Sequence, residues 1–253
     1  MTAPTQVQPR HAGLAGVVTG AGSGIGRACV DLLLAHGARV DAWDRSSDAL
    51  AELAGRDGVA TRVVDVTDPD AVRAAAEQTR TTWGATDFVV NSAGAFLVGP
   101  LAEVSAAAVR GLFDVNVVGT TNVTQALLPA LREARGSIVN VASAVALTAT
   151  PGNAHYAASK AAVAHLTRCW ALELGPDGIR VNAVAPGPTA TAIYRSAGMS
   201  AEQESVLLRE RAATIPLRRL GEASETARWI TRFALEDDWT TGVVLPVDGG
   251  MSL

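Results

Sequence analysis

The chain alternates short apolar runs with longer stretches in which apolar and polar residues follow a helical period. Several short runs are apolar at every position, as expected for strands of a parallel sheet that is covered on both faces. The predicted strands are Leu14–Thr19, Arg39–Trp43, Thr61–Val64, Phe88–Val90, Ser137–Val141, Arg180–Val184 and Val243–Val247. The predicted helices lie near residues 25–36, 47–54, 69–82, 102–132, 154–174 and 222–235.

This β-α-β alternation predicts an α/β fold, in which a doubly wound parallel sheet of about seven strands is flanked by helices and joined by right-handed crossovers. No repeat, low-complexity segment or linker divides the chain, so we expect a single domain over residues 13–253. Residues 1–12 are polar, and we expect them to form a flexible tail. Such sheets bind ligands beyond the carboxyl ends of their strands.

The first predicted strand leads directly into a glycine-rich turn. The turn has the sequence Thr19-Gly20-Ala21-Gly22-Ser23-Gly24-Ile25-Gly26 and opens the first helix. Glycines let the backbone approach a pyrophosphate, and the N–H groups at a helix N-terminus attract anions. A purely structural turn is the alternative, but the place between the first strand and the first helix favours dinucleotide binding.

The second predicted strand ends in Trp43-Asp44-Arg45. A carboxylate at this place can accept hydrogen bonds from both hydroxyls of the adenosine ribose and repels a 2′-phosphate, which favours NAD over NADP. Arg45 argues the other way, since an arginine here could pair with that phosphate. The structural alternative for Asp44 is a helix cap or a turn residue.

Tyr156 and Lys160 form a second candidate site. Lys160 is the only lysine of the chain and lies four residues after Tyr156, on the same face of a predicted helix. A neighbouring ammonium favours phenolate and lowers a tyrosine pKa from about 10 toward neutrality, so the phenol can exchange a proton at working pH. The pair alone is common, and it becomes informative only beside other parts of a site.

The bulk composition excludes several classes of function. The net charge of −4 and the pI of about 5.6 give no basic surface for nucleic acid. No apolar run approaches the roughly 20 residues that a membrane span needs. The two cysteines, Cys29 and Cys169, lie in apolar helical patterns. They indicate free thiols in a reducing compartment, so we expect a cytoplasmic protein without a disulfide framework or a metal site.

Together these motifs resemble the short-chain dehydrogenase/reductase family in its compact form, from about Leu14 to the C-terminus. Asn91-Ser92-Ala93-Gly94 resembles a family motif in which a second asparagine stands at Ser92, and Ser143 lies at the family's spacing before Tyr156. Pro186-Gly187 and the threonines that follow resemble the segment that holds the nicotinamide. The resemblance implies a Rossmann-type fold and an NAD(P)-dependent oxidoreductase that transfers a hydride between nicotinamide and a secondary alcohol or ketone.

The resemblance also implies residue roles. Tyr156 would exchange a proton with the substrate oxygen, Ser143 would hydrogen-bond that oxygen, and Lys160 would bind the nicotinamide ribose. Asn116 would hold, through its local backbone, a water that passes the proton to solvent. The structural alternatives are a polar strand end for Ser143 and a surface amide for Asn116. The implied cofactor-binding residues are Gly20, Ser23, Gly24, Ile25, Gly26, Asp44, Arg45, Asp65, Val66, Asn91, Ala93, Gly94, Tyr156, Lys160, Pro186, Gly187, Thr189 and Thr191.

For the substrate, the resemblance implies a pocket formed by residues 95–101, residues 144–155 and a lid near residues 190–215. The first two segments contain no lysine or arginine, which favours an uncharged, partly apolar substrate, whereas Arg211 and two other arginines of the lid weigh against it. The candidate substrate residues are Phe96, Val145, Leu147, His155 and Tyr194. His155 and Tyr194 could equally face solvent.

The helices near 102–132 and 154–174 are apolar on more than one face, so we expect a second subunit to cover them. The resemblance implies a homotetramer, and full coverage within one subunit is the alternative. One rival function is an NADP-dependent 3-ketoacyl-type ketoreductase, for which Arg218 and Arg219 would offer a small docking patch. A non-enzymatic NAD(P)-sensing regulator is a third hypothesis, and it would be expected to lack the tyrosine or the lysine.

Overall fold

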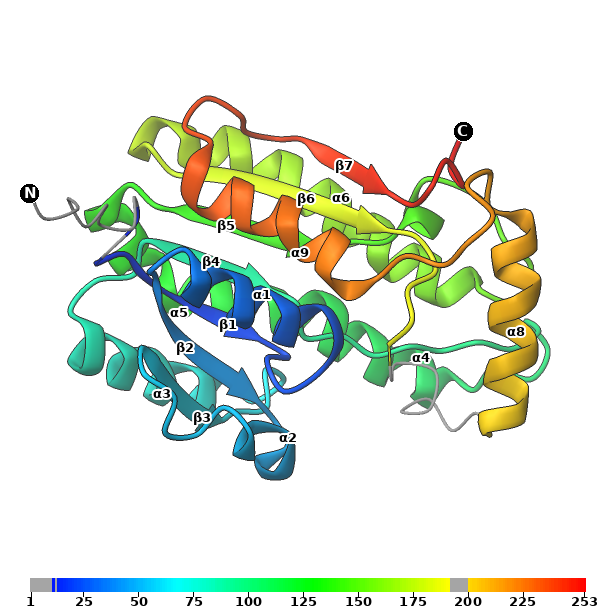
Figure 1. Ribbon diagram of the computed structural model, residues 1–253, viewed down its shortest axis with the longest axis horizontal. Coiled ribbons are helices and arrows are strands. Elements are labelled where there is room, and N and C mark those ends of the chain that lie inside the picture. Colours follow the sequence, from blue (N-terminus) through cyan, green and yellow to red (C-terminus); the bar gives the residue numbers. More distant parts are fainter. Residues whose placement is uncertain (1–10, 12, 192–199) are drawn as a thin grey trace, which may run out of the picture.

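In the residues that the computed structural model describes (11, 13–191 and 200–253), seven parallel strands form one central sheet (Figure 1). The strands are β1 (Ala15–Thr19), β2 (Arg39–Asp44), β3 (Val59–Val63), β4 (Phe88–Asn91), β5 (Ser137–Val141), β6 (Arg180–Pro186) and β7 (Val244–Val247). Their order is β3-β2-β1-β4-β5-β6-β7, so the direction of winding reverses between β1 and β4. The predicted single-domain, doubly wound fold is confirmed, and the reversal creates a crevice at the carboxyl ends of these two strands.

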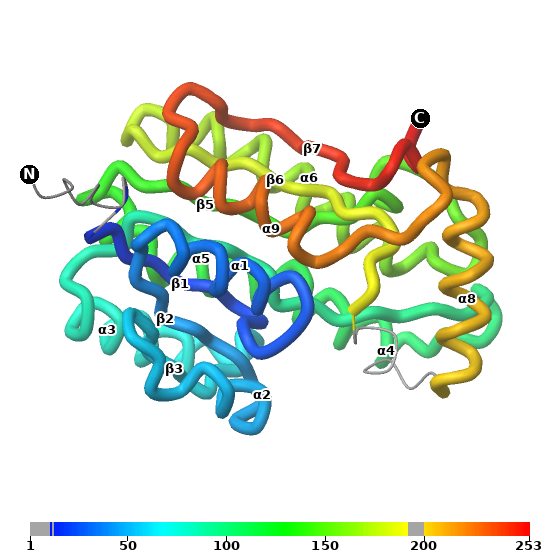
Figure 2. The backbone as a smooth tube through the Cα atoms, in the orientation of Figure 1, coloured from blue at the N-terminus to red at the C-terminus, as the bar shows by residue number. Residues whose placement is uncertain are grey.

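Helices cover both faces of the sheet (Figures 1 and 2). The first face is covered by α1 (Gly24–Ala35) and α9 (Ala223–Thr231), and the second by α3 (Pro69–Trp83), α5 (Thr120–Ala134) and α6 (Ala154–Leu174). Consecutive strand residues point to opposite faces. Val18 of β1 accordingly packs in the core beneath α1 and α9, whereas Val17 packs beneath α3, α5 and α6. Helices shield both faces of the sheet from solvent, which explains why several strands are apolar at every position.

The long helix expected near residues 102–132 is interrupted. It consists of α4 (Ala106–Phe113), a π-helical segment η1 (Asp114–Gly119) and α5. Gly119 ends this segment against the loop after β3, where a Cβ at Gly119 would lie 2.6 Å from Cγ2 of Val66. π-helical turns inside α-helices are frequent at functional sites, and this one contains Asn116.

Helix α8 (Ala201–Thr214) was not predicted, and it lies inside the segment expected to form a lid. The helix lacks a continuous apolar stripe, but Ser200 and Gln203 form a capping box that satisfies backbone groups at its start. The shorter elements are α2 (Ser47–Ala51), η2 (Ala144–Ala146), η3 (Gly175–Asp177) and the π-helical η4 (Arg232–Glu236).

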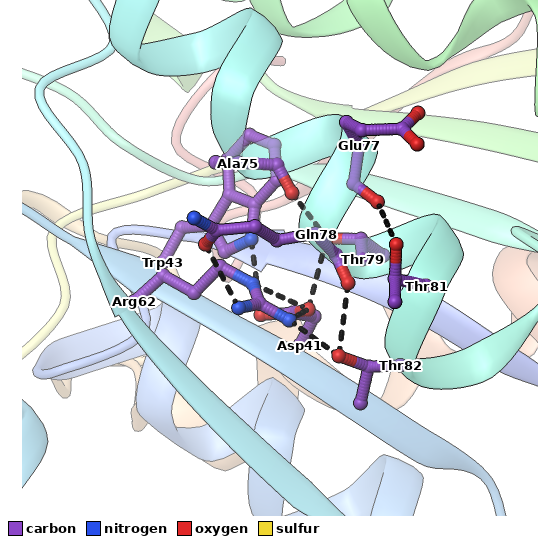
Figure 3. A network of polar contacts seen from close by, with 9 residues as sticks. All are labelled: Asp41, Trp43, Arg62, Ala75, Glu77, Gln78, Thr79, Thr81 and Thr82. Carbon is purple, nitrogen blue, oxygen red and sulfur yellow. Dashed lines mark hydrogen bonds and ion pairs between the residues drawn. The ribbon is translucent and has the colours of Figure 1, made fainter.

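A polar network centred on Asp41 ties β2, β3 and α3 together (Figure 3). Asp41 lies in the middle of β2 and is fully buried. Its carboxylate accepts hydrogen bonds from Trp43 Nε1 at 3.1 Å, Arg62 Nε at 2.9 Å and Thr79 Oγ1 at 2.8 Å. Arg62 of β3 also donates to Gln78 and Thr82 of α3. The network holds the outer strand and its covering helix against the sheet without using any group of the carboxyl edge.

Among the described residues, no helix combines the length and the apolar content that a membrane crossing requires.

Candidate active site

A cavity of about 580 Å³ lies beyond the carboxyl ends of the strands. Its wall begins at the glycine turn after β1, continues past the ends of β2 and β3, and includes the segments that follow β4, β5 and β6. Residues of α6, of α8 and of the C-terminal segment complete it. The cavity therefore occupies the place where a doubly wound sheet is expected to bind a ligand.

The glycine turn packs too closely for side chains. A Cβ at Gly26 would lie 2.2 Å from the carbonyl oxygen of Gly20. Gly20 itself has a φ of +63°, and a Cβ there would lie 2.9 Å from Cα of Ala93. Ser23 makes no capping hydrogen bond through its side chain, and it lines the cavity with Gly24 and Ile25. The first N–H groups of α1 therefore lie at the cavity wall without intrahelical partners, an arrangement that suits a phosphate group.

Asp44 lies on the cavity wall at the end of β2. Its two carboxylate oxygens accept hydrogen bonds from the backbone N–H groups of Gly22 and Ser46, each at 3.0 Å. Arg45 is exposed beside it and also lines the cavity. Across the cavity wall, hydrogen bonds from the backbone and hydroxyl of Thr67 lower the pKa of Asp65, and the charge of Arg45 adds to this effect. Two carboxylates and one guanidinium thus stand at this end.

Tyr156 and Ser143 face the same cavity from α6 and from the segment after β5. The Tyr156 ring is nearly buried and packs edge-on against Phe96, with 4.8 Å between ring centroids. The hydroxyl of Ser143 has no hydrogen-bond partner among the described residues. A hydroxyl that is held at a cavity wall and left unpaired is available to a ligand oxygen.

Lys160 stands one helical turn after Tyr156 and is only 5% exposed. Its Nζ donates a hydrogen bond to the carbonyl of Val141 at 2.8 Å, which leaves two of its three N–H donors for other partners. Burial lowers the pKa of Lys160 from 10.5 to about 8. The ammonium form still predominates at neutral pH, so a positive charge lies beside the tyrosine.

Asn116 lies behind this wall, fully buried in the π-helical segment. Its Oδ1 accepts from the Ala95 N–H at 2.7 Å, and its Nδ2 donates to the Ala95 carbonyl at 3.1 Å and to Ser159 Oγ at 3.0 Å. A Cβ at Gly94 would lie 3.4 Å from both Asn116 Oδ1 and Lys160 Nζ. Asn116 thus holds the backbone at Gly94 and Ala95, after β4, next to Lys160.

The loop after β6 approaches the glycine turn from the opposite side of the cavity. A Cβ at Gly24 would lie 3.3 Å from Cβ and Cγ2 of Thr191. Thr189 donates its hydroxyl to the carbonyl of Gly187 at 2.9 Å, and its backbone bridges to Gly221. Both threonines line the cavity.

Most of the residues expected at the site line the cavity. Of the catalytic candidates, Ser143, Tyr156 and Lys160 line it and Asn116 lies behind it. The expected cofactor residues on the wall are Gly20, Ser23, Gly24, Ile25, Asp44, Arg45, Asp65, Val66, Ala93, Gly94, Tyr156, Lys160, Pro186, Gly187, Thr189 and Thr191. Gly26 and Asn91 do not line it: Gly26 packs against Gly20, and Asn91 donates to Thr124 of α5 and to Asn140 of β5.

Of the substrate candidates, Phe96 and Val145 line the cavity, whereas Leu147 and His155 do not. Leu147 is 40% exposed at the end of η2. Tyr194 lies outside the described residues. Within the described part of the chain, no group of three or more His, Cys, Asp or Glu side chains could hold a metal ion.

The wall also includes residues that the motifs did not single out, among them Asn153, Leu207, Arg211 and Met251. Asn153 lies in the segment 144–155 that was expected to form part of the pocket, at the N-cap of α6 and three positions before Tyr156. Arg211 had been considered only as part of a lid. Leu207 and Met251 follow no motif, because α8 and the C-terminal segment reach the cavity only through the fold.

A family model described as enoyl-(acyl carrier protein) reductase matches residues 20–252. Relatives include a 3-oxoacyl-(acyl-carrier-protein) reductase of Thermotoga maritima, 38% identical and covering 93% of this chain and 96% of that protein. An L-xylulose reductase of Mesocricetus auratus is 38% identical, covering 94% and 97%. An L-fucose dehydrogenase of Oryctolagus cuniculus is 36% identical, covering 96% and 87%.

Solved structures share the fold over nearly the whole chain. An aldohexose dehydrogenase of Thermoplasma acidophilum has a TM-score of 0.87 and 30% identity, covering 96% of both chains. A 3-ketoacyl-(acyl-carrier-protein) reductase of Brucella melitensis, solved in complex with NADH, has a TM-score of 0.89 and 28% identity, covering 96% of this chain and 99% of that one.

Proposed function

The chain belongs to the short-chain dehydrogenase/reductase family of oxidoreductases, and from this premise we propose that it is an NAD(P)-dependent enzyme acting on a secondary alcohol or ketone. One observation carries the proposal. The glycine turn, the unpaired hydroxyl of Ser143, the Tyr156 phenol and the Lys160 ammonium all line a single cavity. A dinucleotide and a small substrate can therefore meet the groups that each of them requires.

The residues at the cavity fit a nicotinamide dinucleotide. The glycine turn leaves no room for Cβ atoms at Gly20 and Gly26, and it brings the start of α1 to the cavity wall. This cradle suits the pyrophosphate, and Asp44 stands where a ribose hydroxyl would find an acceptor. Thr189, Thr191 and Lys160 line the nicotinamide side. When bound, the nicotinamide ring supplies hydride chemistry.

The residues of this chain then handle the proton. In the reducing direction the Tyr156 phenol donates its proton to the substrate carbonyl oxygen, and in the oxidising direction its phenolate accepts the proton of the alcohol. Ser143 donates a hydrogen bond to the same oxygen and holds it in place. The Lys160 ammonium favours the phenolate, and its two open donors suit ribose hydroxyls. Asn116 positions the chain at Ala95 and, through its local backbone, holds a water that returns the proton to solvent.

We propose NAD(H) as the preferred cofactor. Asp44 and Asp65 place two negative charges beside one positive charge, Arg45, at the adenosine end of the cavity. This balance disfavours a 2′-phosphate. Arg45 is the observation that supports NADP(H), because its exposed guanidinium makes no hydrogen bond to the described residues.

The relatives' names divide between acyl-carrier and sugar substrates, so they support the reaction class more than any one substrate. The docking patch required by a 3-ketoacyl-type ketoreductase is weak, since Arg219 forms a two-pronged ion pair with Glu225 and Arg218 donates to the carbonyl of Ala213. A purely NAD(P)-sensing regulator has no need for the complete set of Ser143, Tyr156 and Lys160. We therefore favour a free, uncharged alcohol or ketone.

We also propose a cytoplasmic homotetramer with a substrate lid near residues 190–215. Leu172 on α6 is 82% exposed, as a contact to another subunit would require, and Cys29 and Cys169 are free thiols. Leu207 and Arg211 of α8 line the cavity, which supports the lid. Light scattering that gives a monomer mass at micromolar concentration would contradict the oligomer.

A screen of alcohols and ketones with both cofactors, followed by the absorbance of the reduced nicotinamide, tests the function. We expect turnover of uncharged compounds and a higher kcat/KM with NAD(H). Binding of the cofactor without turnover across the whole panel would instead support the regulator.

A further inference from the structure

Asn153 occupies the N-cap position of α6 but does not cap the helix. Asparagine is among the best N-cap residues, because its side chain accepts a hydrogen bond from a backbone N–H of the first turn. At the starts of α3 and α4, Asp68 and Ser105 make such bonds, whereas the side chain of Asn153 makes none. Helix capping therefore does not explain why an asparagine stands here.

The Asn153 side chain is buried, and its Oδ1 has no hydrogen-bond partner among the described residues. The residue is 5% exposed, and no hydrogen bond links its amide to the other described residues. A buried polar group without a partner is costly and uncommon in folded proteins. Other residues in the described part of the chain also have buried side-chain atoms without a hydrogen-bond partner. Of all these residues, only Asn153 lines the cavity. A residue of the cavity wall thus has unused hydrogen-bonding capacity.

The position of Asn153 relative to Tyr156 indicates which part of a ligand it would meet. Asn153 directly precedes α6 and lies three positions before Tyr156, and both residues line the cavity. Three apolar residues of the cavity wall, Phe96, Val145 and Met251, pack around Tyr156. A substrate whose oxygen is bound at Tyr156 and Ser143 would lie in the cavity to whose wall Asn153 also belongs.

We propose that Asn153 binds a second oxygen of the substrate, adjacent to the reacting carbon, so that the enzyme takes α-hydroxyketones and vicinal diols in preference to simple ketones and alcohols. This inference rests on the function proposed above and sets its substrate class. An amide offers both an N–H donor and an oxygen acceptor, and rotation about its last torsion exchanges them. It can therefore serve the hydroxyl in one direction of reaction and a keto oxygen in the other.

The test compares compounds that differ by one hydroxyl: butanone with acetoin, and cyclohexanone with its α-hydroxy derivative. Calorimetric binding to the protein with bound dinucleotide is measured beside kcat/KM. We expect the wild type to prefer the hydroxylated member by roughly 10-fold in both readouts, and Asn153→Ala to reduce this ratio to near one. The thermal midpoint of Asn153→Ala should not fall, because no capping bond is lost.

Ser105→Ala is the matched control. It removes an N-cap whose hydroxyl accepts from the Ala108 N–H at 3.2 Å, outside the cavity wall. It should lower the thermal midpoint and leave the preference intact. The inference is overturned if the wild type shows no preference, or binds no hydroxylated compound. It is equally overturned if Asn153→Ala keeps the preference, or if binding is confined to α-keto acids and depends on Arg211. A binding preference without turnover would refute the proposed reaction and not the role of Asn153.

Discussion

Two carboxylates of one strand, Asp41 and Asp44 of β2, lie in contrasting surroundings. Asp41 is fully buried and accepts from Trp43, Arg62 and Thr79. Asp44, three residues later, lines the cavity and accepts one backbone N–H on each oxygen, which leaves lone pairs free. The carboxylate in the middle of the strand is fully enclosed by partners inside the protein. The carboxylate at its carboxyl end is open, in the sense that it can still accept hydrogen bonds from a ligand in the cavity.

The same contrast separates the two regions to which these residues belong. In the Asp41 network, each charged group meets its partners inside the protein (Figure 3). At the cavity, the hydroxyl of Ser143, the carboxamide of Asn153 and two donors of Lys160 have no partner in the described chain. Complete satisfaction stabilises a fold, whereas unsatisfied groups on a cavity wall cost stability and are useful only to a ligand. The contrast predicts which substitutions will affect activity and which will affect folding.

The largest effect is expected for Tyr156→Phe in the open region. The substitution removes the hydroxyl that we propose to exchange the proton and keeps the ring that packs against Phe96. We expect kcat to fall by about 10³-fold or more, in the range that general acid–base groups contribute. Calorimetry should show cofactor binding close to that of the wild type. A variant that keeps its rate within a few-fold would remove Tyr156 from the mechanism.

Asp41→Ala should have the next largest effect, on folding. It leaves Arg62, 16% exposed, without its buried partner. Loss of one member of a buried ion pair costs about 3–5 kcal/mol, which urea unfolding would measure as a lower free energy of unfolding. The folded fraction should keep its kcat. Asp57→Ala, at an exposed position, is the control and should stay within about 0.5 kcal/mol of the wild type. Equal stability of the two variants would contradict the role of the network.

The two regions also differ in how well the sequence predicted them. All seven strands were found, most clearly β1 and β4, where burial on both faces leaves continuous apolar runs. The break at η1 was not predicted, since a π-helix differs from an α-helix only in hydrogen-bond register and Asp114–Gly119 has no apolar signature of that change. Helix α8 was missed because it lacks an apolar stripe.

At the site, the motifs located Ser143, Tyr156 and Lys160, but neighbours in sequence were misleading. His155 was a candidate because it adjoins Tyr156, yet consecutive helical residues point about 100° apart, and His155 does not line the cavity. Asn153 does line it, at the N-cap of α6 and three positions before Tyr156. The contribution of α8 depends on how distant segments pack, which no local pattern encodes.

Lys160→Met tests whether an incompletely paired polar group at the cavity lowers the free energy of unfolding. Because burial lowers the pKa of Lys160 from 10.5 to about 8, the folded state binds its proton less tightly than the unfolded state. The charged lysine therefore destabilises the fold at neutral pH, by up to about 3 kcal/mol, and this cost declines as pH rises from about 8 to about 10.5. We expect Lys160→Met to be inactive but at least as stable as the wild type near pH 7, with any advantage shrinking near pH 10. Urea unfolding at both pH values would show an advantage that grows with pH if the reasoning is wrong.

Asp44→Asn should give the smallest effect, since Arg45 and Asp65 at the same end of the cavity are exposed and the charges there are screened by salt. Asparagine keeps one oxygen that can accept a backbone N–H, so the free energy of unfolding should change by less than about 1 kcal/mol. Loss of the negative charge should lower the ratio of kcat/KM for NAD(H) over NADP(H) by about 10-fold. Arg45→Ala is the opposed control, and it should raise the same ratio, because it removes the cation that attracts a 2′-phosphate. Both changes should diminish as salt concentration increases. If the ratio is unaltered in Asp44→Asn and falls in Arg45→Ala, the open carboxylate of β2 does not select the cofactor.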